Sequence, residues 1–309
     1  YFLTSLGDVI LKKNTNIYFV NSNTKQFIIF IDELLKNIIS NFNITNGFIL
    51  KYHDNHDYSN CRIINIKSIF DSNIWNENFN NLWLDLFCVS THYSNRYGSS
   101  DDYIHSSNDD TSINSICFLK NISSKELLFQ YFCDKYISVI ENKESIKCYS
   151  VDMKNVLFIW KHFLNEYQLP NVIYLNTIKS MMTSKFEFDD YRNVFLNITS
   201  KYFPLVVQFG QFWNENITYI DSSSNTVIPY GFKIGEIYRL FQKWNYNNNN
   251  KYNSNTLTTR DHIHQIIDHF YSENLIFKEK YIINITCKLW NKSDDINKSI
   301  EFTNTLIQR

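Results

Sequence analysis

Part of the sequence is repeated near the C-terminus, and this repeat is the main evidence for the fold. The stretch Asn197-Ile198-Thr199-Ser200-Lys201-Tyr202-Phe203 returns as Asn284-Ile285-Thr286-Cys287-Lys288-Leu289-Trp290. Further upstream, Ile159-Trp160-Lys161-His162-Phe163 is echoed by Ile237-Tyr238-Arg239-Leu240-Phe241. The two echoes follow in the same order, 87 and 78 residues apart, and together they indicate two copies of a single supersecondary unit.

Both copies have the same predicted order of elements: an aromatic helix, a second helix, a short hairpin and a closing helix. In the first copy these elements are expected at 155–167, 172–184, 186–196 and 202–215, and in the second at 235–244, 258–271, 275–286 and 293–306. Pro170 ends the first of these helices because the residue before a proline avoids the helical region. Thr258 is the expected N-cap in the second copy. This order is typical of a winged helix-turn-helix, so we expect two such modules in tandem, at 151–221 and 230–309.

The N-terminal region, residues 1–150, has the pattern of a mixed α/β structure. Helical spacing of apolar residues predicts helices at 1–12, 27–39 and 124–140. Runs rich in β-branched and aromatic residues predict strands at 18–20, 61–66 and 82–90, and the polar stretch 99–114 is expected to be a loop. The expected fold class is therefore α+β and helix-rich, with an α/β region followed by the two modules.

Composition narrows the class of protein without naming a function. The 309 residues include no Ala, six Gly and three Pro, but 42 Asn, 25 Phe and 21 Tyr, a usage typical of an A+T-rich genome. Lys and Arg number 30 against 31 Asp and Glu. This balance excludes a strong basic field over the whole chain, so any surface that attracts nucleic acid must be local.

The sequence gives no sign of a membrane or secreted protein. No apolar run reaches the ~18 residues that a membrane-spanning helix needs, and no signal peptide is expected. The six Cys are scattered without a paired spacing, which favours free thiols in a reducing compartment. We therefore expect an intracellular protein. Because the first residue is Tyr, we expect this chain to be part of a longer protein.

Cationic side chains suited to nucleic acid gather in the second copy. A winged helix places a recognition helix in the major groove and its hairpin against the backbone or minor groove. At the start of the expected recognition helix lie Arg260, His262 and His264, and on the hairpin lie Lys278 and Lys280. These five residues are the predicted nucleic-acid-binding set.

The two copies differ in net charge. Residues 155–220 carry five basic and five acidic side chains, whereas residues 233–292 carry nine basic and five acidic ones, a net charge of +4. If one copy binds phosphates, we expect it to be the second. The alternative is that both copies bind proteins, a role that winged helices often have.

Weaker candidates for catalysis lie in the N-terminal region. Residues 27–33 have the form of a Walker B strand, in which Asp32 and Glu33 would order magnesium, but the helical spacing through these acids favours an ordinary amphipathic helix. These residues contain no glycine-rich phosphate-binding loop. Arg96 could act as an arginine finger, although a lone Arg is more often structural. No catalytic residue is assigned with these signals.

A metal site can also be considered, between 53 and 92. His53 and His56, with Asp57, Cys61 and His92, supply the right kinds of ligand. Their spacing fits no common zinc pattern, and His and Asp in polar loops are usually solvated. We expect no metal site in this chain.

Two stretches resemble a known family. Tyr1-Phe2-Leu3-Thr4-Ser5-Leu6-Gly7-Asp8 resembles the helix after the phosphate-binding loop in superfamily 3 helicases of the poxvirus-type primase–helicase family, where Leu-Leu-Gly-Asp endings are frequent. The helix 235–244, the helix after it and Tyr281-Ile282-Ile283 resemble that family's C-terminal winged helix. The Asn-rich, Ala-free composition is similar to that of giant viruses.

The resemblance implies a hexameric, ATP-driven helicase in viral DNA replication, whose winged helices bind DNA or other replication proteins. It also implies a location in the host cytoplasm or in a virion. ATP and magnesium would then belong to the full-length protein, because the phosphate-binding loop is absent from these residues. Only Asp32, Glu33 and Arg96 could be carried over as catalytic. The alternative is a non-enzymatic viral scaffold or a transcription-associated protein.

Overall fold

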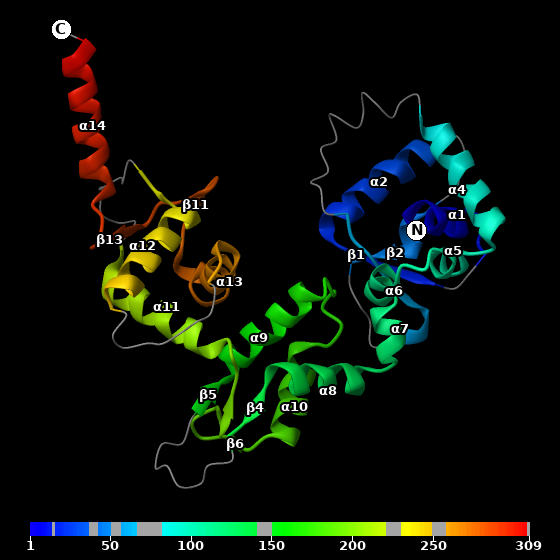
Figure 1. Ribbon diagram of the computed structural model, residues 1–309, viewed down its shortest axis with the longest axis horizontal. Coiled ribbons are helices and arrows are strands. Elements are labelled where there is room, and N and C mark those ends of the chain that lie inside the picture. The colour runs from blue at the N-terminus through cyan, green and yellow to red at the C-terminus, as the bar shows by residue number, and fades with distance from the viewer. Residues whose placement is uncertain are drawn as a thin grey trace. The chain divides into compact units, whose positions relative to one another are not determined.

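The computed structural model describes residues 1–13, 16–36, 43–50, 57–66, 82–140, 150–220, 230–248 and 258–307. These residues form a mixed α+β structure that is rich in helix and contains only small sheets (Figure 1). The chain divides into two compact units, Tyr1–Ile198 and Thr199–Arg309. The coarse expectation of a helix-rich α+β protein is confirmed, and the boundaries drawn at 150 and 221 stay predictions.

The first unit opens with a parallel sheet of three strands in the order β2-β1-β3. The strands are β1 (Ile17–Val20), β2 (Phe48–Ile49) and β3 (Cys61–Ile64). Helices α1 (Phe2–Ile10) and α2 (Ser22–Lys36) pack apolar side chains with those of the strands into one core. The 3₁₀ turns η1 (Thr45–Gly47) and η2 (Tyr58–Asn60) lead into β2 and β3. The helices expected at 1–12 and 27–39 and the strands expected at 18–20 and 61–66 are therefore confirmed, except that residues 37–39 lie outside the described part of the chain.

The stretch 82–90 is a helix, contrary to the strand that we expected. It forms the first part of α4 (Trp83–Tyr97), which packs closely on α1. A Cβ built at Gly7 would lie only 2.1 Å from the carbonyl oxygen of Ser90. Ser90 and Ser94 are the buried residues of α4, one turn apart. Small side chains at this spacing let the two helices approach, and the apolar run around them hid this helical pattern.

The stretch 99–114 also differs from the expected loop. It contains α5 (Ser100–Ser106) and α6 (Asp110–Ile116), and α7 (Phe118–Ile122) follows. Ser99 and Asp109 cap the first two helices, because their side chains accept hydrogen bonds from backbone N–H groups in the first turn. Ser and Asp are also the residues of turns, so composition alone could not separate a loop from two short capped helices.

A buried ion pair joins β3 to α5. The Arg62 guanidinium, 3% exposed, donates to both carboxylate oxygens of Asp101, at 3.0 and 2.6 Å. Burial alone would raise the pKa of the Asp101 carboxyl, but the hydrogen bonds and charge of Arg62 outweigh it and hold the pKa below its usual value of 3.8. The pair therefore stabilises the fold while Asp101 is ionised.

The substitution Asp101→Asn should lower the free energy of unfolding of the first unit by about 3 kcal/mol at pH 7, because it leaves the buried Arg62 charge without its counter-ion. A carboxyl with a depressed pKa contributes stability above its unfolded pKa and loses it as the pH falls through the folded pKa. The deficit of the variant should therefore shrink below about pH 4. Urea unfolding at pH 7, 5 and 3.5 measures it.

Asp110→Asn is the matched control, since Asp110 is exposed in the first turn of α6. It should change stability by about 0.5 kcal/mol or less. An Asp101→Asn deficit that is equally large at pH 7 and pH 3.5 would contradict this role of the ion pair.

The remaining chain is built from two repeats, which we call repeat 1 (Lys125–Ile198) and repeat 2 (Phe203–Cys287). Repeat 1 contains α8 (Lys125–Tyr136), β4 (Ser138–Val139), β5 (Ser150–Asp152), α9 (Met153–Glu166), α10 (Leu175–Lys185), β6 (Phe188–Asp189) and β7 (Val194–Leu196), and β8 (Ile198–Thr199) begins at its last residue. Repeat 2 contains α11 (Phe203–Asn216), β9 (Ile217–Tyr219), β10 (Phe232–Lys233), α12 (Ile234–Asn247), α13 (Arg260–Phe270), η3 (Ser272–Asn274), β11 (Phe277–Lys278), β12 (Tyr281–Ile282) and β13 (Ile285–Cys287). Helix α14 (Lys292–Ile307) follows. The helices and hairpins expected in both copies are confirmed.

Strand pairing is the same in the two repeats. The sheet order is β5-β7-β6 in repeat 1 and β10-β12-β11 in repeat 2, and all pairs are antiparallel. Val151 pairs with Phe195 in repeat 1, and Phe232 pairs with Ile282 at the same place in repeat 2. In each case the strand before the two helices pairs with the last strand of the hairpin. Strands β5 and β10, which come directly before the two helices, were not predicted.

The repeated Asn-Ile-Thr sequence marks equivalent positions. In repeat 1 the Ile140 N–H donates to the Asn197 carbonyl at 2.8 Å, and in repeat 2 the Ile220 N–H donates to the Asn284 carbonyl at 3.0 Å. Each bond ties the chain after the opening helix to the chain after the hairpin. The sequence repeat therefore coincides with a repeat of structure.

The opening helix of each repeat packs an aromatic ring on its second helix. In repeat 1 Phe132 of α8 lies 5.0 Å from Trp160 of α9, and in repeat 2 Phe212 of α11 lies 5.5 Å from Phe241 of α12, measured between ring centroids. All four side chains are fully buried. Helix α11 therefore opens repeat 2, whereas the sequence pattern had made it the closing helix of the first copy.

The same contacts correct the alignment of the second helices. The sequence echo matched Trp160 with Tyr238 and Phe163 with Phe241. The structure instead matches Trp160 with Phe241 and Phe163 with Trp244, a shift of three residues. Three residues are almost one helical turn, so the apolar face looks the same in both alignments and only the packing partners distinguish them.

Candidate nucleic-acid interface

The predicted cations of α13 have different surroundings. Arg260 is the first residue of the helix, and both Arg260 and His264 are exposed. His262 takes part in the helix cap: its Nδ1 accepts from the Thr259 N–H at 3.4 Å, and its own N–H donates to Thr259 Oγ1 at 3.3 Å. The N-cap is thus Thr259 and not Thr258 as expected. His262 has a structural part here that the sequence did not indicate.

The other predicted cations lie on the hairpin of repeat 2. Lys278 ends β11 and Lys280 lies in the turn before β12, and both are exposed. Glu279 between them adopts a left-handed conformation with φ of 56°, so the turn is tight. The hairpin therefore carries two lysines on a short, well-defined loop.

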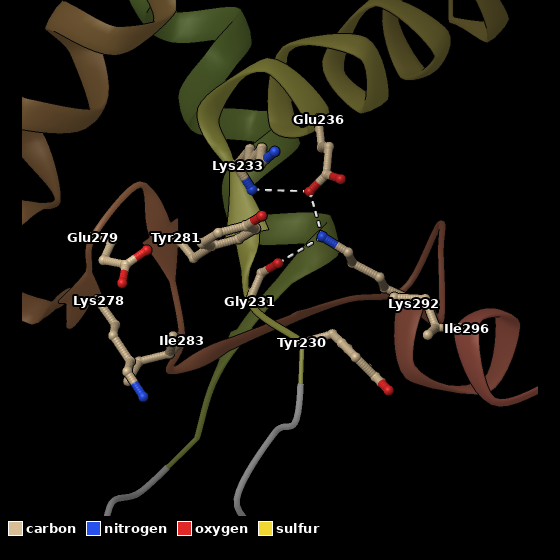
Figure 2. Close-up of a pocket in the computed structure, with 10 residues that line it drawn as sticks. All are labelled: Tyr230, Gly231, Lys233, Glu236, Lys278, Glu279, Tyr281, Ile283, Lys292 and Ile296. Atoms are coloured by element: carbon tan, nitrogen blue, oxygen red, sulfur yellow. Dashed lines mark hydrogen bonds and ion pairs between the residues drawn. The ribbon is translucent and has the colours of Figure 1, made fainter. Parts of the chain in front are cut away.

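A pocket of about 360 Å³ opens beside this hairpin (Figure 2). Its lining comes from the chain around β10, the start of α12, the hairpin and the start of α14, and it includes Lys233, Glu236, Lys278, Tyr281 and Lys292. A concave site of this size falls in the range that takes small ligands or single groups of larger ones.

One row of side chains crosses the sheet at this pocket. Lys233 of β10 and Lys278 of β11 both pair with Tyr281 of β12, so the tyrosine stands between two lysines. The Lys233 ammonium lies 5.0 Å from the centre of the Tyr281 ring. Directly opposed side chains on a sheet face the same side and act together. The row therefore joins an aromatic surface to two exposed positive charges.

The inner side of the pocket is fixed by a buried ion pair. Lys292, 7% exposed, places its Nζ 2.6 Å from a Glu236 carboxylate oxygen and donates to the Gly231 carbonyl at 2.6 Å. The same Glu236 oxygen accepts from the backbone N–H of Lys233 at 2.9 Å. Figure 2 shows the bonds from Lys233 and Lys292 meeting at one Glu236 oxygen, and the third bond running from Lys292 to Gly231. One carboxylate thus holds both β10 and the first residue of α14.

Aromatic rings complete the surroundings of this ammonium. The Nζ of Lys292 lies 5.5 Å from the ring centres of Phe232 and Trp290 and 5.6 Å from that of Tyr281. Rings within about 6 Å attract a cation through their negative faces. The inner end of the pocket is therefore charged but already neutralised.

Repeat 1 has the opposite chemistry at the same register. Its cross-strand row is Asp152 of β5, Val194 of β7 and Asp189 of β6, paired as in repeat 2. Two acids thus replace Lys233 and Lys278, and an aliphatic side chain replaces Tyr281. Because the backbone pairing is the same, this difference is one of surface chemistry and not of fold.

The two repeats differ less in net charge than the two copies that were counted from the sequence. Residues 125–198 carry nine basic and nine acidic side chains, and residues 203–292 carry nine basic and seven acidic ones, a net charge of +2. Of the two acids in 203–232, Glu215 was counted with the first copy from the sequence pattern, and Asp221 lay outside both ranges. The contrast between the repeats therefore lies in the cross-strand row and not in their overall charge.

Sequence reasoning missed Lys233, Tyr281 and Lys292 as parts of this site. Lys233 lies on β10, a two-residue strand without a periodic pattern, and Lys292 is at a helix start. A strand-by-strand alignment of the two repeats would have found the row, but it needs strands β5 and β10, which the sequence did not reveal.

The weak catalytic candidates lie in the first unit. Asp32 is buried in α2 and accepts a hydrogen bond from the Ile44 N–H at 2.7 Å, and Glu33 is exposed on the same helix. The helical interpretation of this stretch is confirmed, so a Walker B strand does not form there. Arg96 is exposed in the last turn of α4, with its guanidinium 5.7 Å from the Tyr97 ring centre.

The candidate metal ligands are only partly described. His53 and His56 lie outside the described residues, Asp57 accepts a hydrogen bond from the Ser59 N–H, and Cys61 is buried in β3. Within the described parts of the chain, no group of three or more His, Cys, Asp and Glu side chains could hold a metal ion. None of the helices described is both long and apolar enough to cross a membrane.

No family model, no curated protein and no solved structure matches this chain. The resemblance to primase–helicases thus stays a hypothesis.

Lys292→Met should lower the free energy of unfolding of the second unit by about 2–3 kcal/mol, because it leaves the Glu236 carboxylate without its partner. Glu236 is about a quarter exposed, so water offsets part of the loss. The double variant Lys292→Met, Glu236→Gln should be less destabilised than the sum of the single variants. Urea unfolding followed by tryptophan fluorescence measures these differences.

Lys288→Met is the matched control for charge, because Lys288 is exposed three residues beyond Ile285. It should have little effect on stability. Strictly additive losses in the double variant would mean that Lys292 and Glu236 do not depend on each other.

Proposed function

We propose that both repeats are winged helix-turn-helix modules, and that repeat 2 is the one that binds nucleic acid. The order of elements supports the first part: each repeat has an opening helix, a strand, two helices and a hairpin. The strand before the two helices, β5 or β10, pairs with the second strand of the hairpin, β7 or β12. Helix α13 would then be the recognition helix, and the β11–β12 hairpin would be the wing.

One observation carries the second part of the proposal: the Lys233–Tyr281–Lys278 row stands where repeat 1 has Asp, Val and Asp. Affinity for nucleic acid comes mainly from lysines and arginines that neutralise phosphates. Acids at the same register repel phosphates. The two repeats therefore differ most at the place where a wing would contact the backbone.

The start of α13 supplies the second set of contacts. Arg260 and His264 are exposed there, and the N-terminus of a helix carries partial positive charge that favours anions. The guanidinium of Arg260 also lies 3.5 Å from the position of a Cβ at Gly235, at the start of α12. Arg260 thus extends over two helix N-termini, a placement suited to a phosphate.

In this proposal the chain is a DNA-binding part of a viral replication protein of the primase–helicase type. ATP hydrolysis with magnesium would then depend on residues outside this chain. Repeat 1 favours a second role, the binding of another replication protein or of a second copy. Its hairpin presents Tyr191, 98% exposed, beside the acidic row. Exposed aromatic side chains are typical of protein interfaces.

The double variant Lys233→Asp, Lys278→Asp places in repeat 2 the acidic side chains that repeat 1 carries at the same positions. Because repeat 1 pairs its strands in the same way with Asp152 and Asp189 there, repeat 2 should still fold. It should weaken binding of the full chain to a 20-base-pair DNA duplex at least about tenfold at low salt, and reduce the slope of log affinity against log salt by about 1.8. Fluorescence anisotropy at several salt concentrations measures both. Charge reversal at Arg260 or Lys280 should also weaken binding.

Lys179→Asp and Arg192→Asp in repeat 1 are the controls, because both are exposed cations on the corresponding helix and hairpin. They should change the affinity by less than about twofold. Equal losses in the two repeats, or no salt-dependent binding to DNA or RNA at low salt, would refute nucleic-acid binding by repeat 2.

A further inference from the structure

We infer that the pocket beside the wing of repeat 2 holds one unpaired nucleotide, with the base against Tyr281 and the flanking phosphates at Lys233 and Lys278. The inference rests on the proposed function and names its substrate: single strands, or duplexes with a single-stranded overhang. It goes beyond phosphate binding because it assigns a base-binding surface.

The shape of the site favours a base over a duplex backbone. The pocket is concave, and its walls include two aromatic side chains, Tyr230 and Tyr281, and the aliphatic Ile283 and Ile296. Apolar and aromatic walls with a few polar groups are typical of sites that enclose a small planar ligand. A phosphate backbone alone would require only the exposed lysines.

The distribution of charge sets the orientation of the nucleotide. At the inner end, Lys292 is neutralised by Glu236, so that end offers no free charge to a phosphate. At the outer side, Lys233 and Lys278 are exposed side chains. The base of the nucleotide therefore enters the pocket, and its phosphates stay outside, at the ammonium groups of Lys233 and Lys278.

Tyr281 can be reached from solvent on the face that Lys233 covers. Lys233 is an exposed side chain on a flexible stem, and its ammonium is 5.0 Å from the ring centre. An incoming base can take the place of this ammonium, which then turns to the adjacent phosphate. Bases stack on aromatic side chains in this way with little dependence on sequence.

A paired base is excluded for a simple reason. In a duplex both faces of each internal base are covered by its neighbours, and a terminal base is held in its pair, so the pocket takes only an unpaired base. Repeat 1 has Val194 in place of Tyr281, and therefore lacks the stacking surface.

The test uses the full chain with three DNA ligands: a single strand, a duplex with a single-stranded overhang, and the same duplex with blunt ends. Wild type should bind the first two at least about tenfold more tightly than the blunt duplex. Tyr281→Val should remove this preference and leave blunt-duplex binding within about twofold, because the lysines remain. Tyr281→Phe should keep the preference.

A spectroscopic readout accompanies the affinities. The fluorescence of 2-aminopurine placed in the overhang should be quenched by wild type and by Tyr281→Phe, but not by Tyr281→Val. Tyr191→Val in repeat 1 is the control and should behave as wild type. Val occupies the equivalent position in repeat 1, so the fold should tolerate Tyr281→Val, and circular dichroism checks this. An RNA strand of the same sequence shows whether the sugar matters.

Two negative outcomes are distinguishable. If wild type binds all three ligands equally, or if Tyr281→Val weakens all three equally without a change in quenching, the nucleotide pocket is wrong while nucleic-acid binding by repeat 2 stands. If wild type binds none of them and Lys233→Asp, Lys278→Asp has no effect, the proposed function itself fails, and the pocket inference fails with it.

Discussion

The carboxylate of Glu236 is the constraint on which the candidate interface depends. It accepts from the Lys233 N–H and pairs with the buried ammonium of Lys292, so it fixes the junction of β10 with α12 and the start of α14 together. A buried charge without a counter-ion is strongly destabilising, so replacing either Glu236 or Lys292 alone lowers the stability of the fold. Tyr281 is held in the same cluster through its contact with Lys292. The orientation of the cross-strand row follows from this cluster.

The two repeats share a core and differ in their surface. Each has a ring on its opening helix, Phe132 or Phe212, against a ring on its second helix, and each pairs its strands in the same register. Buried positions of this kind specify the fold, and they tolerate few changes of shape. The charged side chains of the cross-strand row lie outside this core, so lysines could stand in one repeat and acids in the other. This is why one architecture can serve two different roles in one chain.

The sequence was a good guide where a segment buries one helical face, as in α9 and α12, and where a hairpin alternates around a polar turn. It failed for α4, because Ser90 and Ser94 make the close contact with α1 and an apolar run around them resembles a strand. It also failed for β5 and β10, which are too short to show alternation and exist only because β7 and β12 pair with them. Of the candidate site, the exposed cations could be predicted, but not Tyr281 or Lys292, whose roles depend on strand pairing and burial.

Hydrogen–deuterium exchange of the full chain with and without single-stranded DNA tests the central claim most directly. We predict that bound DNA slows exchange at residues 230–233 and 277–283 of repeat 2 and leaves residues 150–152 and 188–196 of repeat 1 unchanged. Equal protection of the two repeats, or no protection at saturating DNA, would contradict the account.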